Sequence, residues 1–402
     1  MAEETPLWKV SELNTHQLVV NEFSFSEEIR ISDCTLRDGE QQAGVVFTKE
    51  DKIEIAKSLD KIGIHEIESG MPAVSQEDCE AIEVLASLGL NAKITALARA
   101  TKSDIDLVAD IGAWGVSISF PIGDLQRKYK MKLSDDEYIR TCLELTEYAK
   151  RKGLHVILSP YDNTRVRMGF LETLLTALEK EKTVDRIRLV DTVGAAHPRS
   201  IQFLVNRMKQ INPRLPIEVH CHDDFGLATA NTLAALEAGA EVASVTVNGI
   251  GERSGNCPLE EVVVALKILY GKELGIEIEK LKEVSQLVES ISAIPLQPHK
   301  PIVGQNSFKH ESGMVVAGLL QNNFVAEPYL PELVGQSREI IVGKKSGVQS
   351  LKYKLSSLGF SPNDEQLKQC LSQVKQTAIA HKRSLTDCEV KEIYEQLQIK
   401  AQ

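Results

Sequence analysis

The sequence contains no run of 18 or more apolar residues, which predicts that the chain does not span a membrane. Its seven cysteines are scattered, odd in number and never spaced as Cys-x-x-Cys, so they are expected to be reduced. The N-terminus also lacks the basic and apolar regions of a secretory signal. These absences together predict a cytoplasmic protein.

The chain also lacks an excess of positive charge, since acidic residues outnumber basic ones and the net charge is −11. This balance argues against nucleic acid or an acidic membrane as a partner. What the sequence does contain is ordinary for a globular protein, with 43% hydrophobic and 26% charged residues. A chain of 402 residues is long enough for one large domain and a smaller one.

Apolar, β-branched runs alternate with amphipathic helical stretches along the first two thirds of the chain. Eight strands, each followed by a helix, within about 250 residues predict an α/β fold of the (β/α)8 TIM-barrel type. An open, doubly wound sheet is the alternative, but it would need a Gly-rich phosphate turn after the first strand, and residues 37–41 do not form one. The predicted strands cover residues 29–34, 65–69, 92–97, 115–120, 155–159, 187–190, 217–220 and 243–247.

The pattern changes after the barrel. A helix is predicted from residue 274, and three prolines between residues 295 and 301 indicate a connector. Three short helices are predicted at the C-terminus, over residues 347–358, 363–381 and 387–398. The predicted organisation is an N-terminal extension (1–27), a TIM-barrel catalytic domain (28–275), a linker helix with a lid-like subdomain (276–347) and a small helical C-terminal domain (348–402).

Two segments carry most of the chemical information. Arg37 and Asp38 follow the first predicted strand, and His220 and His222 lie at the end of the seventh. Residues at i and i+2 of a strand point to the same side, so the two imidazoles face one way. One carboxylate and two imidazoles form half of a divalent-cation site, and the arginine beside them can hold an anionic oxygen. These residues suggest chemistry on a carbonyl or a carboxylate.

Further polar residues follow other predicted strands. Glu68, Arg99 and Thr192 come at the ends of strands two, three and six, and the loop 248–256 follows strand eight. In a TIM barrel, the catalytic groups lie at the carboxyl ends of the strands. All the polar residues of interest are therefore expected at one end of the barrel.

Residues 33–41, 219–224 and 248–261 resemble the signature segments of the DRE-TIM metallolyases. The resemblance extends over about residues 28–345 and is greatest to the 2-isopropylmalate, homocitrate and citramalate synthases. It implies a metal-dependent acyltransferase that condenses acetyl-CoA with a 2-oxo acid and releases CoA.

Position by position, the resemblance implies roles for individual residues. The implied ligands of a divalent Zn, Mn or Mg ion are Asp38, His220, His222 and Asn256. Arg37 resembles the arginine that steadies an enolate oxygen, and Thr192 resembles the threonine that binds the carboxylate of the 2-oxo acid. The full predicted substrate-binding set is Arg37, Gln41, Glu68, Arg99, Ile157 and Thr192.

The chain departs from these relatives at two acid–base positions. Val315 stands where the synthases usually carry a histidine, and Tyr161 stands where they often carry a glutamate. The identity of the base that removes a proton from the acetyl methyl group is therefore left open. The predicted catalytic residues are Arg37 and three candidates for this base, Tyr161, His310 and Glu311.

The identity of the 2-oxo acid is also open. Ile157 stands near a position where homocitrate synthases tend to carry an arginine, which favours a neutral, apolar 2-oxo acid. Arg99 or Arg165 remains an alternative source of positive charge.

Other interpretations compete with the synthase. The chain could be a carbon–carbon lyase resembling hydroxymethylglutaryl-CoA lyase, or a metal- and ligand-binding homologue without catalysis. Thr192 could cap a helix, and the basic segment 126–130 could be a solvated loop or contact CoA phosphates. Cys257 is expected to be a small filler rather than a nucleophile. A homodimer is predicted, with residues 305–345 reaching the barrel of the partner.

Overall fold

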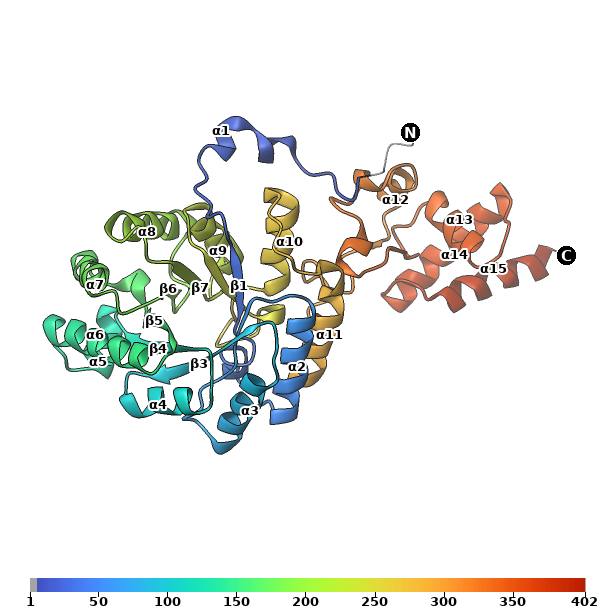
Figure 1. Ribbon diagram of the computed structural model, residues 1–402. Helices are drawn as coiled ribbons and strands as arrows, with labels where there is room; N and C mark the ends of the chain where they lie inside the picture. The colour runs from blue at the N-terminus through green and yellow to red at the C-terminus, as the bar shows by residue number, and fades with distance from the viewer. Residues whose placement is uncertain (1–5, 402) are drawn as a thin grey trace. The chain divides into compact units, whose positions relative to one another are not determined.

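The computed structural model describes residues 6–401, which form two compact units (Figure 1). One unit covers Glu12–Leu296, and the other joins residues 6–11 to the chain from residue 297 onward. The first five residues of the predicted N-terminal extension lie outside the described part. Within residues 6–401, no helix combines the length and apolar character needed to cross a membrane.

The first unit contains eight parallel strands in a closed barrel. Each strand pairs with the next in sequence, and β1 pairs with β8 in the register Ile31↔Ala243, which closes the barrel. This arrangement confirms the predicted (β/α)8 fold. The strands are β1 (Arg30–Asp33), β2 (Glu66–Glu68), β3 (Lys93–Arg99), β4 (Gly115–Pro121), β5 (His155–Tyr161), β6 (Arg186–Asp191), β7 (Ile217–Cys221) and β8 (Val242–Val245).

Each barrel strand is followed by at least one helix. Helix starts are encoded locally: the Thr48 and Ser134 side chains accept hydrogen bonds from backbone amides of the first turns of α2 and α6 in capping boxes. The helices of this unit are α1 (Gln17–Val20), α2 (Lys49–Lys61), α3 (Gln76–Ser87), α4 (Lys102–Asp110), α5 (Asp124–Lys130), α6 (Asp135–Arg151), α7 (Met168–Glu181), α8 (Pro198–Ile211), α9 (Ala228–Glu237), α10 (Leu259–Tyr270) and α11 (Leu281–Ser292).

Two details differ from the sequence-based expectations. The basic segment 126–130 is helical, as part of α5, and not a loop. The helix predicted from residue 274 begins at Leu281, after a short 3-10 turn. Helix α11 packs against α2 and belongs to the barrel unit, whereas the predicted division assigns it to the linker. The functional division of the chain stays a prediction.

Charged side chains fill part of the barrel interior. Arg186 on β6 donates to Glu66 on β2 at 2.8 Å, and its Nε lies 2.9 Å from Glu218 on β7. One layer nearer the mouth, Arg188 lies 3.1 Å from Glu68 and 2.8 Å from Glu218. All five side chains are buried. We call these residues the buried charge ladder; it joins β2, β6 and β7 through ion pairs.

The second unit has its own apolar core. The elements it contains are β9 (Lys309–His310), α12 (Gly313–Leu319), β10 (Glu339–Ile340), α13 (Val348–Ser357), α14 (Asp364–His381) and α15 (Asp387–Ala401). Buried side chains of the last three helices, such as Leu355, Leu367 and Val390, pack together. These helices confirm the predicted helical C-terminal region, and residues 305–347 contain only short elements, as expected from their glycine-rich sequence.

Candidate active site at the mouth of the barrel

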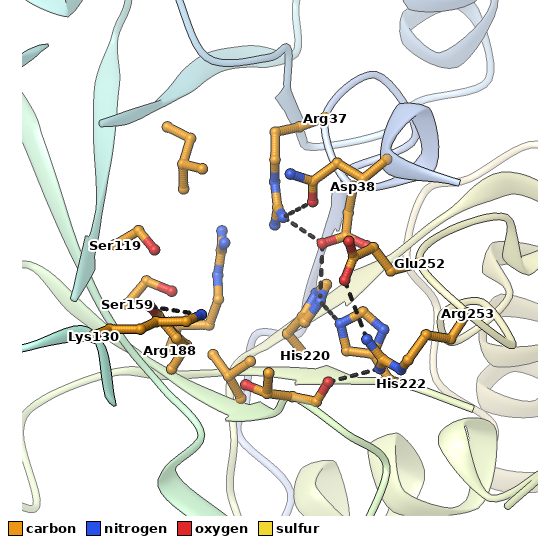
Figure 2. A pocket seen from close by; sticks show the side chains of 15 residues that line it. Arg37, Asp38, Ser119, Lys130, Ser159, Arg188, His220, His222, Glu252 and Arg253 are labelled. Atoms are coloured by element: carbon orange, nitrogen blue, oxygen red, sulfur yellow. Dashed lines mark hydrogen bonds and ion pairs between the residues drawn. The ribbon is translucent and has the colours of Figure 1, made fainter. Parts of the chain in front are cut away.

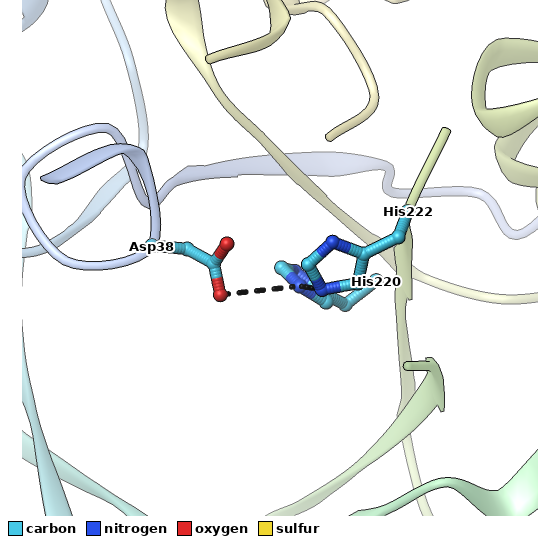
Figure 3. Close-up of side chains that lie close together, drawn as sticks. All are labelled: Asp38, His220 and His222. Atoms are coloured by element: carbon cyan, nitrogen blue, oxygen red, sulfur yellow. Dashed lines mark hydrogen bonds and ion pairs between the residues drawn. The ribbon is translucent and has the colours of Figure 1, made fainter. Parts of the chain in front are cut away.

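Asp38, His220 and His222 lie together at the carboxyl ends of β1 and β7 (Figure 3). Their candidate ligand atoms all lie within 4.8 Å of one another. The Nε2 atoms of the two histidines are 3.3 Å apart, and the Asp38 Oδ2 atom is 3.7 Å from the His220 Nε2 atom. The i, i+2 spacing on β7 therefore brings both imidazoles to the carboxylate.

The protonation states in this cluster favour binding of a cation. Burial alone would raise the pKa of the Asp38 carboxyl, but the charge of Arg37 and of the two histidines holds it well below its usual range. Burial lowers the pKa of His220 strongly and also lowers that of His222. A charged carboxylate and neutral imidazoles are the forms that ligate metals.

A chain of hydrogen bonds orients His220 from behind. The Nδ1 atom of His220 lies 3.0 Å from the Ser244 hydroxyl, which lies 3.5 Å from the Cys34 thiol, and that thiol donates to the Val245 carbonyl at 3.3 Å. Burial raises the pKa of the Cys34 thiol, so the thiol keeps its proton. When Nδ1 donates to Ser244, the lone pair of His220 is on Nε2, the nitrogen that faces Asp38.

The loop after β8 brings Asn256 to the cluster. Asn256 donates from Nδ2 to the Asp38 Oδ1 atom at 2.7 Å. A Cβ atom on Gly251 would lie 2.0 Å from that Nδ2 atom, so glycine is required there. Gly255 adopts a φ of +95°, and a Cβ atom on it would lie 2.0 Å from a backbone oxygen. The two glycines allow the amide to approach the carboxylate.

The residues present fit a divalent cation. The Oδ1 atom of Asn256 is buried and has no hydrogen-bond partner, while the Nδ2 atom of the same amide binds the carboxylate of Asp38. Oxygen and imidazole donors in this mixture suit Zn²⁺, Mn²⁺ or Mg²⁺. A bound cation would give this unpartnered amide oxygen a partner.

Arg37 is held beside this cluster. Its Nε and Nη2 atoms donate to Glu68 Oε2 at 3.0 and 2.8 Å, and Nη1 donates to Asp38. Glu68 is fixed in turn by Arg188, and the two arginines overcome the effect of burial to lower its pKa to about 2. The guanidinium is therefore positioned before any substrate arrives.

A cavity of about 270 Å³ opens over these residues (Figure 2). Seven predicted site residues line it: Arg37, Asp38, Gln41, Tyr161, Thr192, His220 and His222. Eight other lining residues were not predicted: Leu97, Ser119, Lys130, Ser159, Arg188, Val190, Glu252 and Arg253. The sequence contained a sign that Arg188 lies inside the barrel. Arginine alternates with apolar residues along its strand, and the side chains of a barrel strand face alternately inward and outward, so the arginine is expected to face the barrel interior.

Several predicted site residues lie elsewhere. Glu68 and Asn256 are buried behind Arg37 and Asp38. Ile157 does not line the cavity and is fully buried, because it lies one inward-facing position deeper on β5 than Ser159. The Arg99 side chain is exposed and paired with Asp104, outside the cavity lining. The structure thus places Ile157 and Arg99 outside this cavity lining, and their expected substrate contacts stay predictions.

The structure bears on two cavity residues whose roles the sequence left open, Thr192 and Tyr161. The Thr192 hydroxyl is buried without a hydrogen-bond partner, and His197, not Thr192, caps helix α8. The unpaired hydroxyl is free to bind a ligand. Tyr161 also lines the cavity, and its hydroxyl lies 3.5 Å from the Lys130 ammonium.

His310 and Glu311 belong to the second unit. His310 contacts Glu327 through Nε2 at 3.0 Å, and Glu327 is also bound by Arg338. The carboxylate of Glu311 accepts hydrogen bonds from the Lys345 amide and the Ser384 hydroxyl, both at 3.0 Å. His310 is thus an imidazole oriented by a carboxylate, as in acid–base catalysis, whereas Glu311 is committed to backbone and hydroxyl contacts.

Cys257, beside Asn256, is buried, and burial raises the pKa of its thiol to about 12. A thiol that keeps its proton is a poor nucleophile, which agrees with a packing role.

A buried arginine next to an Asp-His-His cluster, at the mouth of a closed eight-stranded barrel, is the arrangement of the DRE-TIM metallolyases, the class that the motifs predicted. The chain belongs to the HMGL-like family, which matches residues 28–288. Residues 302–382 match the family described as homocitrate synthase post-HMGL domain-like.

Curated relatives cover most of the chain. A probable 2-isopropylmalate synthase of Ignicoccus hospitalis is 43% identical over 92% of this chain and 92% of its own length. The (R)-citramalate synthase of Methanocaldococcus jannaschii is 47% identical over 87% of this chain and 70% of its own. A homocitrate synthase of Methanopyrus kandleri is 43% identical over 93% and 94%.

Solved structures agree on the fold. The crystal structure of a Bacillus subtilis HMG-CoA lyase covers 68% of this chain and 96% of its own, with a TM-score of 0.59 and 22% identity. At that identity, the likeness concerns the barrel architecture alone.

Proposed function

We propose that this protein is a metal-dependent acyltransferase that condenses acetyl-CoA with a 2-oxo acid and hydrolyses the thioester to release CoA. The observation that carries the proposal is the cluster of Asp38, His220 and His222 with Arg37 inside one cavity. Relatives at 43–47% identity are named as 2-isopropylmalate, citramalate and homocitrate synthases, and this supports the same reaction type.

Asp38, His220, His222 and the amide oxygen of Asn256 would hold the divalent ion. When bound, such an ion supplies Lewis-acid polarisation of a ketone. Arg37 directs its charge to the same place, where negative charge develops on the substrate oxygen. Thr192 offers its unpaired hydroxyl to the substrate carboxylate.

A base must remove a proton from the acetyl methyl group, and the carbanion then forms the new carbon–carbon bond to the ketone carbon. Tyr161, in the cavity, and His310, oriented by Glu327, are the two candidates that the geometry favours. Glu311 is less suited, because both of its oxygens already accept hydrogen bonds. Water finally cleaves the thioester, and CoA leaves as the free thiol.

The lyase alternative has less support, since residues 302–382 match a domain described for homocitrate synthases. The experiment that separates the candidates measures free thiol released from acetyl-CoA across a panel of 2-oxo acids, with and without a chelator. Chelator-sensitive release with at least one acid is expected. Cleavage of 3-hydroxy-3-methylglutaryl-CoA without any condensation would favour the lyase, and absence of both reactions would favour a binding protein.

A further inference from the structure

Arg253 joins three loops at the mouth of the barrel. It lies in the loop after β8, which also carries Asn256. Its Nε and Nη2 atoms donate to the two carboxylate oxygens of Asp224, at 2.8 and 3.0 Å. The Nη2 atom also donates to the backbone carbonyl of Thr192 at 2.7 Å. Asp224 belongs to the loop after β7 and Thr192 to the loop after β6, so one guanidinium contacts all three loops.

Two of these contacts lead to residues of the candidate site. Thr192 follows β6, and its hydroxyl is buried without a hydrogen-bond partner. His222 is the first residue after β7, and Figure 2 shows Arg253 beside it. We call Asp38, His220 and His222 the metal-ligand cluster. The contacts of Arg253 therefore help to fix the distance between the Thr192 hydroxyl and this cluster.

The backbone of the loops is shaped for close contact. Arg253 has a φ of +58°, a left-handed conformation that residues other than glycine rarely adopt and that persists where the surroundings hold it. Gly194, in the loop after β6, has a φ of +57°, and a Cβ atom on it would lie 2.9 Å from the Asp224 Oδ2 atom. The loops after β6 and β7 are thus packed too closely for a side chain at this point, and Arg253 bridges them.

The charge of Arg253 is balanced within the protein. Its hydrogen bonds to Asp224 lower the pKa of that carboxyl, so the carboxylate stays charged at neutral pH. The Nη1 atom of Arg253 also lies 3.2 Å from the Glu252 carboxylate. A guanidinium with two carboxylate partners is a weaker partner for a substrate anion, although it lines the cavity. A positioning role fits these contacts better than direct binding.

We propose that Arg253 is a positioning residue that places the Thr192 hydroxyl for the carboxylate of the 2-oxo acid. This inference rests on the proposed function, in which Thr192 binds that carboxylate. Arg253 holds the Thr192 carbonyl, and Asp224 fixes the direction of the guanidinium. Loss of Arg253 would let Thr192 shift relative to the metal-ligand cluster. The 2-oxo acid would then bind less tightly, whereas acetyl-CoA would not.

The test compares wild type, Arg253→Ala, Thr192→Val and the double variant. Thiol release is measured with the acid that wild type uses best among pyruvate, 2-oxoisovalerate, oxaloacetate and 2-oxoglutarate. Thr192→Val should raise KM for this acid about 10–100-fold, the loss expected for a hydrogen bond to a charged group, and Arg253→Ala should approach that loss. KM for acetyl-CoA should stay near wild type. The double variant should show no further rise beyond Thr192→Val, because Arg253 acts through Thr192.

Two further variants serve as controls. Arg207 is also paired with a carboxylate, that of Glu172, but it lies on α8 outside the cavity lining. Arg207→Ala should therefore keep all wild-type values. Arg253→Lys retains the charge but cannot donate to both loops in one plane, so it should behave like Arg253→Ala. Full rescue by lysine would show that charge alone matters and would overturn the positioning role.

Other results would overturn the inference in distinct ways. A rise in KM that adds to that of Thr192→Val in the double variant would mean that Arg253 contacts the substrate directly. An unchanged KM in Arg253→Ala, with a lower melting temperature, would leave only a structural contact between the loops. Both results would leave the proposed function intact.

A second readout does not need turnover. In protein supplied with Zn²⁺, Mn²⁺ or Mg²⁺ but without acetyl-CoA, each of the four acids is added in turn. At least one acid should raise the melting temperature of wild type more than that of Arg253→Ala or Thr192→Val. If no acid supports thiol release, yet this difference is observed, the proposed reaction fails and the positioning role stands. Equal melting behaviour of all three proteins would refute the role.

Discussion

Arg37 is held between the carboxylates of Glu68 and Asp38, so a substitution that tests its role should keep a positive charge at this position. Lysine keeps the charge but loses the planar, forked geometry of the guanidinium. Arg37→Lys should lower the turnover rate by about 10²-fold or more, because one preorganised donor to the developing oxyanion is lost. Steady-state kinetics and thermal melting check this. Arg99→Lys is the control and should change neither, and near-normal turnover of Arg37→Lys would contradict the role.

Asp33, on β1, should make stability depend on pH. Burial raises the pKa of its carboxyl to about 7, and its Oδ2 atom has no hydrogen-bond partner. The unfolded value is about 3.9. Between these values the folded state binds the extra proton, so the free energy of unfolding should fall as pH rises from 4 to 7, by roughly 4 kcal/mol at most.

Urea unfolding at pH 5 and pH 8 tests this contribution. Asp33→Asn should show a smaller difference between the two pH values than wild type, because it has no carboxyl to titrate. The exposed Asp110→Asn variant should keep the wild-type difference. An unchanged difference in Asp33→Asn would show that Asp33 is already ionised in the folded protein.

At the scale of elements, the metal-ligand cluster depends on two strand ends. Asp38 follows β1, and His220 ends β7, so either Asp38→Ala or His220→Ala removes one ligand. Both variants should lose most of the bound metal in elemental analysis, as should chelator-treated wild type. His299→Ala removes an exposed histidine of the second unit that is not part of the cluster, and this variant should retain the metal. Equal metal content in all four proteins would contradict the assignment of the metal site.

The buried charge ladder makes a separate prediction. Arg186→Met would leave Glu66 and Glu218 buried with fewer partners, which should lower the free energy of unfolding by about 3–5 kcal/mol. Denaturant unfolding followed by circular dichroism measures the change. Adding Glu66→Leu to Arg186→Met should recover part of the loss, since one of the unpaired charges is then removed. No recovery would mean that packing, and not charge pairing, determines the cost.

The elements themselves could be predicted from the sequence. Eight β-branched runs alternate with amphipathic helices, and polar residues follow the strands, so the barrel and the meeting of Asp38 with His220 and His222 could be anticipated. The depth of a side chain along its strand could not be predicted in this way. Residues two apart share a face of the strand, so Ile157 and Ser159 look alike in the sequence. Lys130 was also hidden, since a basic run does not reveal which of its members turns toward a cavity.

At the scale of the whole molecule, we expect a homodimer in which the second unit of one subunit completes the barrel site of its partner. The cavity lining contains Tyr161 but no residue from 305–345, and His310 is an imidazole oriented by Glu327. Mixing His310→Ala with Asp38→Ala subunits should restore part of the activity, because one mixed site carries neither lesion.

A matched control is the mixture of Asp38→Ala with His220→Ala. Both lesions lie in the barrel, so no mixed site is intact and no activity should return. A monomer in sedimentation, or no recovery in the first mixture, would contradict the shared site.

The buried charge ladder also bears on how the barrel can form. Glu66 and Glu68 belong to the first half of the chain's eight strands, whereas Arg186, Arg188 and Glu218 belong to the second half. In a half-barrel of β1–β4, Glu66 and Glu68 would keep Arg30 and Arg37 nearby but would lack both arginines of β6. A half-barrel of β5–β8 would carry Arg186 and Arg188 with Glu218 as their one partner in the ladder. Neither half can bury its inner surface alone, so closure of the barrel is coupled across 120 residues of sequence separation.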